Sequence, residues 1–248
     1  TPRLSSAASD VYKRQPNGEG PIVVWLKSAL RVHENPAIDI GLLLADRYQK
    51  SLLIYQAIDE RYPHASLRHH NMLLDGALDL HLGCQKQGLR YVLHVVREDN
   101  RQSVVKSFAN SASCIVTDLF PLPPWTQWIK NIAQSAACPI IEVDCHCVIP
   151  MTMFGKSVDR PFKFRDATKK MRKRLVQQGW PKNEVVVPEF HGELPFRPID
   201  IEEQVAITKN RIKLLKNCNI DPSVLPIWRE RGGEVASLAK WQRFLEKN

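Results

Sequence analysis

Two basic side chains, Lys27 and Arg31, closely follow the apolar run Ile22–Leu26. The run has the length and β-branched content of a buried parallel strand. Loops at the carboxyl ends of parallel strands are where α/β proteins hold ligands. Cations in such a loop can bind an anionic or polar ligand, so we interpret this stretch as a candidate binding edge. A solvated loop or an interdomain salt bridge remains the alternative for both residues.

Other candidate functional side chains could equally have only a structural role. Asp118 ends a later apolar run, where it could meet a ligand or cap the next turn. His33, His69 and His70 could donate protons because histidine titrates near neutrality. The sequence places no acid or nucleophile beside them, which favours surface or helix-face histidines. Trp125 and Trp128 are three residues apart on an expected helix, a spacing more typical of core packing than of electron transfer.

A metal site is not expected. Cys145 and Cys147 flank His146 and could share one face of a strand. No second Cys/His pair lies nearby to complete a tetrahedral site. The six cysteines show no regular spacing of a disulfide framework, so an intracellular, reducing and cytoplasmic setting is expected. They are Cys84, Cys114, Cys138, Cys145, Cys147 and Cys218.

A basic segment at 160–174 could contact nucleic acid. The chain has a formal net charge of +9, which permits an anionic partner without requiring one. Phe162 and Phe164 lie within the segment and could stack on bases, while its cations could follow phosphates. A solvated basic helix is the alternative. The eight cations are Arg160, Lys163, Arg165, Lys169, Lys170, Arg172, Lys173 and Arg174.

The secondary-structure elements that position these residues are predicted to alternate between strands and helices. Five short apolar runs predict buried strands at 22–26, 52–58, 91–96, 114–117 and 140–143. Helical patterns between them predict helices at 36–48, 66–87, 100–109 and 124–137, the first with Asn35 as N-cap and Pro36 at its first position. The alternation predicts an α/β fold with a doubly wound, Rossmann-like, five-stranded parallel sheet.

The composition and the hydrophobic pattern of the sequence change outside residues 21–150. Residues 1–20 have no sustained apolar segment of a signal peptide and are expected to form a disordered or non-native tail outside the fold. Residues 151–200 are rich in proline and predict an interdomain linker. Helical patterns return at 202–216 and 233–247, and the chain stops within the second, so 201–248 is expected to begin a truncated all-α domain. No apolar run approaches the roughly 18 residues that span a bilayer.

Several stretches resemble the photolyase/cryptochrome family. "VVWLKSALRVHENPAI" is similar to the family's first strand and loop, with Lys27 for Arg and Glu34 for Asp, and with Ala29 where the family usually has an acid. Trp25, Leu30, Arg31 and Asn35 match that pattern. "ASLRHHNMLLDGALDLHLGCQKQGL" resembles the second helix, and "CIVTDLFPL" with "IIEVDCHCVIP" the fourth and fifth strands. Near the end, Gly232, Gly233, Glu234, Ala236, Phe244 and Leu245 match the first helix of the family's flavin domain.

The resemblance implies a function. It implies that 21–150 is an antenna domain holding a folate, deazaflavin or flavin, which passes excitation to FAD in the helical domain for repair of pyrimidine dimers in DNA. The chain would then be part of a monomeric deoxyribodipyrimidine photo-lyase, without catalytic residues or FAD of its own. The implied antenna residues are Trp25, Leu26, Lys27, Arg31, Asp118, Leu119 and Phe120. The implied DNA-contact residues are Lys169, Lys170, Arg172 and Arg174.

Two other functions stay open at this stage. The first is a cryptochrome, a blue-light photoreceptor of the same fold without repair activity. The second is an unrelated nucleotide-binding α/β domain that uses the same strand-end crevice. The sequence gives little support to the second, because it contains neither Gly-x-Gly-x-x-Gly nor Gly-x-x-x-x-Gly-Lys-Ser/Thr to bind phosphates.

Overall fold

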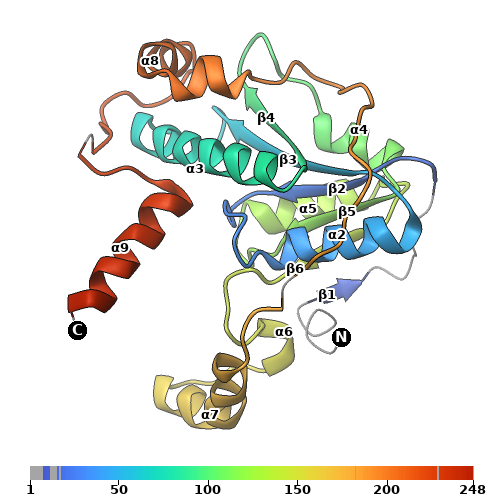
Figure 1. Cartoon of the computed structure of the whole chain (residues 1–248), viewed down its shortest axis with the longest axis vertical. Coiled ribbons are helices and arrows are strands. Elements are labelled where there is room, and N and C mark those ends of the chain that lie inside the picture. The colour runs from blue at the N-terminus through green and yellow to red at the C-terminus, as the bar shows by residue number, and fades with distance from the viewer. Residues whose placement is uncertain (1–7, 12–15, 17, 182, 228, 248) are drawn as a thin grey trace.

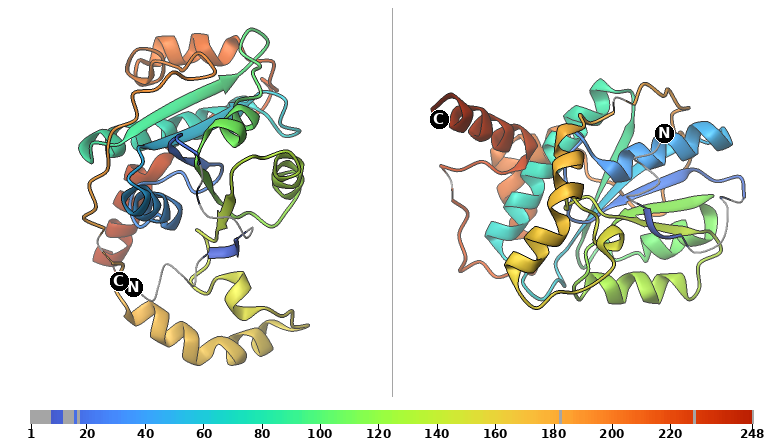
Figure 2. Two further views of the ribbon diagram at one scale, coloured as in Figure 1. Left: turned by 90° about the vertical axis from the view of Figure 1, so that its right-hand side faces the viewer. Right: turned by 90° about the horizontal axis from the view of Figure 1, so that it is seen from below.

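A six-stranded sheet with helices on both faces forms the main body of the protein (Figures 1 and 2). The computed structural model describes residues 8–11, 16, 18–181, 183–227 and 229–247. The strand order is β1-β6-β5-β2-β3-β4, in which β2 to β6 are parallel and β1 is antiparallel to β6. The predicted five-stranded parallel sheet is therefore confirmed.

The parallel strands lie close to their predicted positions. They are β2 (Ile22–Leu26), β3 (Leu52–Asp59), β4 (Arg90–Val96), β5 (Cys114–Asp118) and β6 (Ile140–Val143). Nearly every residue in them is buried, which is why they appear in the sequence as short continuous apolar runs. Strand β1 (Ala8–Val11) lies within the segment 1–20 that the sequence placed outside the fold. It pairs with the outer edge of β6, so the sheet has one strand more than predicted.

The helices cover the two faces of the sheet. Helices α2 (Pro36–Tyr48) and α3 (Leu67–Lys86) pack with Val24 and its neighbours on one face. Helices α4 (Val104–Ser111) and α5 (Trp125–Ala133) pack with Trp25 on the other. Successive residues of a strand face opposite sides, so β2 contributes to both cores.

Hydrogen bonds of two asparagine side chains explain where two of these helices begin. The Asn35 side chain accepts the backbone N–H of Ala37 at 3.0 Å and donates to the carbonyls of Ala29 and Arg31, so it both caps α2 and holds the preceding loop. Helix α4 begins four residues later than predicted. The buried Asn100 amide donates instead to the carbonyls of Val95 and Arg197, which keeps residues 100–103 out of the helix.

After β6 the chain forms α6 (Met151–Phe154) and α7 (Pro161–Gln177), which lie below the sheet in Figure 1. Residues 178–181 and 183–200 then run back along the α/β domain (Figure 1). Trp180 Nε1 donates to Asp39 at 2.9 Å, and the Ile199 N–H donates to the Leu93 carbonyl at 3.0 Å. The π-helical turn η1 (Glu202–Ala206), α8 (Thr208–Lys216) and α9 (Gly233–Lys247) follow.

The strand order indicates where ligands of such sheets usually bind. From β2 the connections proceed outward to β3 and β4, and the chain then returns to β5 on the other side of β2. Strands β2 and β5 are therefore neighbours whose connections run in opposite directions. Ligands of doubly wound sheets bind beyond the carboxyl ends of the strands at such a point. In this chain the carboxyl ends of β2 and β5 are Leu26 and Asp118.

Candidate functional site

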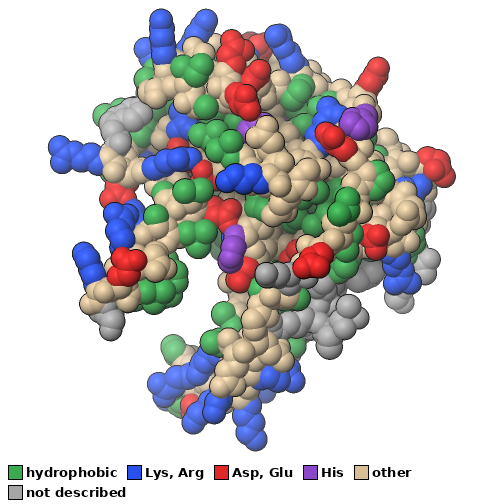
Figure 3. All heavy atoms as spheres, in the orientation of Figure 1, with side chains coloured by type: hydrophobic (Ala, Val, Ile, Leu, Met, Phe, Trp, Pro, Cys, Tyr) green, Lys and Arg blue, Asp and Glu red, His purple; other side chains and the backbone are tan. Residues whose placement is uncertain are grey.

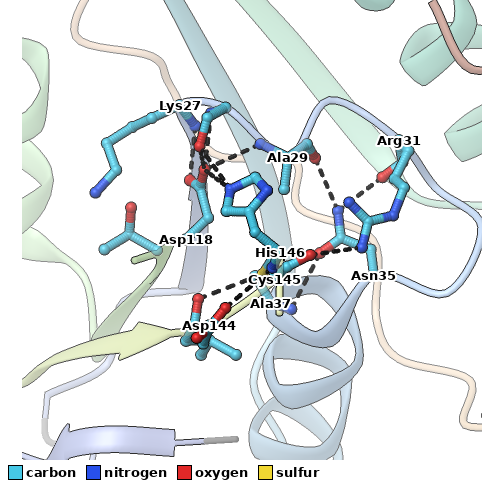
Figure 4. A network of polar contacts seen from close by, with 12 residues as sticks. Lys27, Ala29, Arg31, Asn35, Ala37, Asp118, Asp144, Cys145 and His146 are labelled. Carbon is cyan, nitrogen blue, oxygen red and sulfur yellow. Dashed lines mark hydrogen bonds and ion pairs between the residues drawn. The ribbon is translucent and has the colours of Figure 1, made fainter. Parts of the chain in front are cut away.

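Asp118 organises the loop that follows β2 (Figure 4). Its buried carboxylate accepts the backbone N–H groups of Lys27 and Ser28, both at 2.7 Å, and that of Ala29 at 3.0 Å. It also accepts the Ser28 hydroxyl, whose oxygen lies 3.0 Å from His146 Nε2. These four donors occupy the carboxylate, so Asp118 fixes the loop rather than pointing into a cavity.

The Lys27 side chain turns away from that network (Figure 4). Its ammonium nitrogen is buried and has no hydrogen-bond partner among the described residues. It lies 5.1 Å from the centroid of the Trp25 ring. Burial lowers the pKa of Lys27 from its ordinary value of 10.5, and the negative charge of Asp118 opposes this shift. An ammonium in this setting lacks a ligand that would compensate for its lost hydration.

Lys27 lines a cavity that we call the strand-end pocket. It lies beyond the carboxyl ends of β2, β3 and β4 and has a volume of about 390 Å³. Its walls come from several separate elements and combine ring-bearing, aliphatic and polar side chains. The ring-bearing side chains that line it are Trp25, Tyr55, Tyr62, His69, His94, Trp125 and Trp128. Small-molecule sites typically combine such apolar walls with a few polar groups.

The inner wall of the pocket includes a buried hydrogen-bonded pair, Tyr55 and His94. The distance from the Tyr55 hydroxyl to His94 Nδ1 is 3.0 Å, and His94 Nε2 lies 2.9 Å from the Asn100 carbonyl oxygen. Because a carbonyl only accepts, His94 carries its proton on Nε2 and accepts from Tyr55 through Nδ1. Burial lowers the pKa of His94 and raises that of Tyr55, so both are neutral near pH 7. These two side chains are already satisfied by one another.

The neighbouring histidines of α3 are also neutral. His69 lines the pocket and stacks on Tyr62 with ring centroids 5.1 Å apart. Burial, and then the nearby His64, lower the pKa of His69. His70 points into the protein and is 1% exposed, and burial lowers its pKa to about 4. Neither residue is a proton donor near neutral pH; both lie on helix α3, and His70 is on its buried face.

Only part of the predicted antenna set lies on the pocket. Trp25 and Lys27 line it, and Phe120 does not, although its ring contacts that of Trp125 at a centroid distance of 4.8 Å. Leu26 is completely buried in the core. The Leu119 N–H donates to the Val143 carbonyl at 2.7 Å, which ties that residue to β6.

Arg31 lies on the other side of the loop from Lys27. Its guanidinium donates to the Cys145 carbonyl at 2.8 Å and to the Glu34 carbonyl at 3.2 Å. It lines a different cavity of about 1020 Å³, bounded by this loop, the end of α7 and α9. Lys27 and Arg31 therefore do not share a ligand site.

Sequence reasoning missed most of the pocket wall. Tyr55 and His94 sit inside apolar strand runs and carry no signal of their own. Trp125 and Trp128, interpreted as core packing, are half-exposed and line the pocket. The sequence feature that could have predicted this is their i, i+3 spacing at the start of the helix that follows β5, because this position brings both rings to the strand ends.

The remaining candidates lie elsewhere. Cys145 is buried and Cys147 is exposed, so the two thiols do not share a face. The described residues contain no group of three or more His, Cys, Asp or Glu placed to hold a metal ion. On α7, Lys169, Lys170 and Arg174 are exposed, whereas Arg172 is half-buried against a groove between α6 and α7.

Comparison with known proteins identifies the family. The model of the family described as DNA photolyase matches residues 22–201. This chain belongs to the DNA photolyase family. The family boundaries include the strand-end pocket, α7 and the segment that returns along the sheet.

The curated relatives are photolyases. The chain is 24% identical over 241 residues to a deoxyribodipyrimidine photo-lyase of Methanothermobacter thermautotrophicus, covering 94% of this chain and 50% of that protein. It is 27% identical over 131 residues to the deoxyribodipyrimidine photo-lyase of Potorous tridactylus, covering 52% of this chain and 24% of that protein. The chain thus spans half or less of the length of these relatives.

A solved structure shares the fold. An archaeal photolyase from Sulfolobus tokodaii, described as containing two FAD molecules and implying a novel light-harvesting cofactor, aligns with a TM-score of 0.56 at 14% identity. The alignment covers 88% of this chain and 45% of that one. No helix among the described residues is long and apolar enough to cross a membrane.

Proposed function

We propose that the chain is the N-terminal part of a light-driven DNA-repair flavoprotein, a deoxyribodipyrimidine photo-lyase, and that the strand-end pocket holds its antenna chromophore. Membership of the DNA photolyase family and the photo-lyase relatives support the class of protein. The Sulfolobus tokodaii photolyase, described with a second FAD as an implied light-harvesting cofactor, supports a chromophore in addition to the repair flavin.

The observation that carries the pocket assignment is the unpartnered ammonium of Lys27. Buried polar groups in proteins are almost always hydrogen-bonded. The Lys27 nitrogen is buried at the edge of a preformed cavity without a partner among the described residues. A chromophore with a carbonyl or anionic oxygen at this edge would supply the missing acceptor.

The walls suit a planar aromatic molecule. Trp25, Tyr62 and Trp125 all line the pocket, and aromatic rings pack well against a flat conjugated system. Tyr55 and His94 bond to each other, so this wall can contact an apolar ring without leaving a polar group unpaired. The volume of about 390 Å³ lies in the range of small-molecule sites.

The chromophore and the protein residues have different roles in this proposal. When bound, the chromophore absorbs light and passes the excitation to FAD. The protein residues orient the chromophore through Lys27, enclose its ring and exclude water. The relatives are about twice as long as this chain. In this proposal the repair FAD and the flipped-out pyrimidine dimer bind in the part of the full protein that corresponds to their other half, so the 248-residue chain does not hold the repair FAD.

Titration with candidate chromophores tests the pocket. The purified chain is titrated separately with a reduced folate, a deazaflavin, FMN and FAD, and quenching of tryptophan fluorescence is followed. One of them should bind stoichiometrically. Lys27→Met should weaken that binding roughly tenfold to a hundredfold, because a charge-assisted hydrogen bond is worth about 1.5–3 kcal/mol.

The control is Lys86→Met at an exposed position of α3, which should bind as the parent does. Equal affinity of parent and Lys27→Met, or no binding of any chromophore, contradicts the assignment of the pocket. Repair is tested on the full-length protein by illuminating dimer-containing DNA. Chromophore binding with no repair there would favour the photoreceptor function.

A further inference from the structure

Helix α7 holds most of the net charge of the chain. Of its 17 residues, seven are Lys or Arg and one is Asp. Its net charge is therefore +6, compared with a formal net charge of +9 for the whole chain. Thr168 is its one buried residue. Figure 3 shows Lys and Arg side chains gathered around the lower part of the molecule, where α7 lies in Figure 1.

These cations are not spread evenly around the helix. With 3.6 residues per turn, five of them fall within an arc of about 140° centred opposite Thr168. All five are exposed. We call them the cationic face of α7: Lys163, Lys169, Lys170, Lys173 and Arg174.

The opposite side of α7 is partly covered by other parts of the protein. Met171 and Leu175 are half-buried there, and the Phe164 ring meets Phe154 at a centroid distance of 5.0 Å. Arg172 is also half-buried and lines the groove between α6 and α7. The fold thus determines which side of the helix faces solvent.

The cationic face lacks compensating charge. Lys163 forms an ion pair with Asp159 at 2.8 Å, and the other four cations form no ion pair with any described residue. Lys169 and Lys173 are four residues apart, as are Lys170 and Arg174, so like charges are neighbours on the helix surface. Such pairs destabilise an isolated helix by a few tenths of a kcal/mol each. A partner with regularly spaced negative charges would reverse this effect.

We propose that the cationic face of α7 binds the phosphates of duplex DNA as a contact surface outside the lesion site. From Lys163 to Arg174 the face extends about 17 Å along the helix, enough to meet several consecutive phosphates. Its five members are four lysines and one arginine, which suit contacts with phosphates. Binding through phosphates alone positions a protein on DNA without reading its sequence.

An anionic lipid surface fits the face less well. A helix that binds lipid inserts an apolar side opposite its cations. In α7 Met171 and Leu175 on that side are half-buried. The exposed large apolar residues of the helix do not form a continuous side opposite the cations: Phe162 (48% exposed), Phe164 (42%) and Val176 (66%). The choice of DNA as the anionic partner rests on the proposed DNA-repair function. A binding test on undamaged DNA in the dark does not involve the chromophore, so the two can fail separately.

The test uses the 248-residue chain and a labelled, undamaged duplex, with binding followed by fluorescence anisotropy in the dark. If about four phosphates are neutralised, log K should fall by roughly 3–4 per log unit of salt. Affinity should therefore drop about a hundredfold between roughly 50 and 200 mM salt. Two duplexes of different sequence should bind equally.

A fourfold variant, Lys169→Glu, Lys170→Glu, Lys173→Glu and Arg174→Glu, should lose at least about thirtyfold in affinity at the lower salt concentration. The control reverses four exposed lysines elsewhere: Lys86→Glu, Lys209→Glu, Lys213→Glu and Lys216→Glu. It changes net charge equally and should lose less than about threefold. The corresponding Gln variant of α7, with helicity checked by circular dichroism, should weaken binding in the same direction without repulsion.

Three results overturn the proposal. Equal losses in the α7 and control variants would show that net charge alone drives binding. A salt slope near zero would show that no phosphates are neutralised. Anionic lipid vesicles that bind the parent through the same four residues, while duplex DNA does not, would assign the face to a membrane surface.

Discussion

The carboxylate of Asp118 accepts the backbone N–H of Ser28 at 2.7 Å and so joins the ends of β5 and β2 where the connections of the sheet reverse direction. The same carboxylate holds the N–H groups of Lys27 and Ala29. With the backbone of Lys27 fixed there, its side chain is directed into the strand-end pocket. Asp118 thus contributes to the site without lining it.

Asp118→Asn should lower the free energy of unfolding by about 3 kcal/mol, because hydrogen bonds to a charged acceptor are lost and the new amide NH₂ faces backbone donors. Urea denaturation measures the change. Asp159→Asn, at an exposed position of the loop before α7, is the control and should change stability by less than about 0.5 kcal/mol. A loss below about 1 kcal/mol in Asp118→Asn would contradict the role assigned to this carboxylate.

Lys27→Met should stabilise the ligand-free chain while it weakens chromophore binding. The substitution removes an unpartnered buried ammonium and keeps a flexible apolar side chain of similar length. We expect a gain of about 1–3 kcal/mol in the free energy of unfolding near neutral pH. A destabilised Lys27→Met chain would show that the ammonium already has a favourable environment.

The pH dependence of that gain has a definite sign. Burial lowers the pKa of Lys27 in the folded chain below the ordinary value of 10.5, so the unfolded chain binds more protons between the two values. The stability of the parent therefore rises with pH in that window, relative to Lys27→Met. The advantage of the Met variant should shrink as pH approaches 10.5. Urea denaturation of both proteins across the alkaline range checks this.

How far the sequence predicts the fold depends on the kind of element. Strands such as Ile22–Leu26 and Ile140–Val143 were placed to the residue, because strands buried on both faces are short apolar runs. Strand β1 was missed because its pairing depends on the free edge of β6 rather than on its own pattern. The start of α4 was missed because the Asn100 amide bonds carbonyls of β4 and of a segment almost a hundred residues away.

The sequence likewise predicts some parts of the candidate site and not others. The sequence predicts a strand-end loop with Lys27 and Arg31, but the backbone geometry imposed by Asp118 and Asn35 sends the two side chains to different cavities. Trp128 and His94 reach the pocket from different elements, and no local pattern reports that convergence. Topology brings strand ends together, whereas the direction of each side chain follows from long-range hydrogen bonds.

His70 should make the chain less stable in acid. Burial, followed by the neighbouring His69, lowers the pKa of His70 from 6.5 to about 4. The unfolded chain therefore takes up this proton first, and stability falls as pH drops from about 6.5 to about 4. The shift corresponds to about 3 kcal/mol. His70→Leu should remove this contribution, while the exposed His191→Leu should not. Parallel stability curves for the parent and His70→Leu would contradict the prediction.

Glu234 should hold α9 to the loop that carries Lys27. One oxygen of its carboxylate accepts the Val32 N–H at 2.9 Å, and the other accepts the His33 N–H at 2.7 Å. Asp118 fixes the beginning of this loop and Glu234 fixes its middle, although about two hundred residues separate Glu234 from Val32. Glu234→Gln replaces one acceptor with an NH₂ donor, so one of these two N–H groups loses its partner.

Glu234→Gln should therefore lower the free energy of unfolding by about 1–2 kcal/mol and speed hydrogen exchange at the Val32 and His33 amides. Hydrogen exchange followed by NMR reports the two amides individually, and urea denaturation gives the stability. Glu246→Gln lies on the exposed surface of the same helix and serves as the control with unchanged exchange in the loop. If the two amides keep their protection in Glu234→Gln, then Asp118 and Asn35 alone hold the loop. In that case α9 is free to move without disturbing the strand-end pocket.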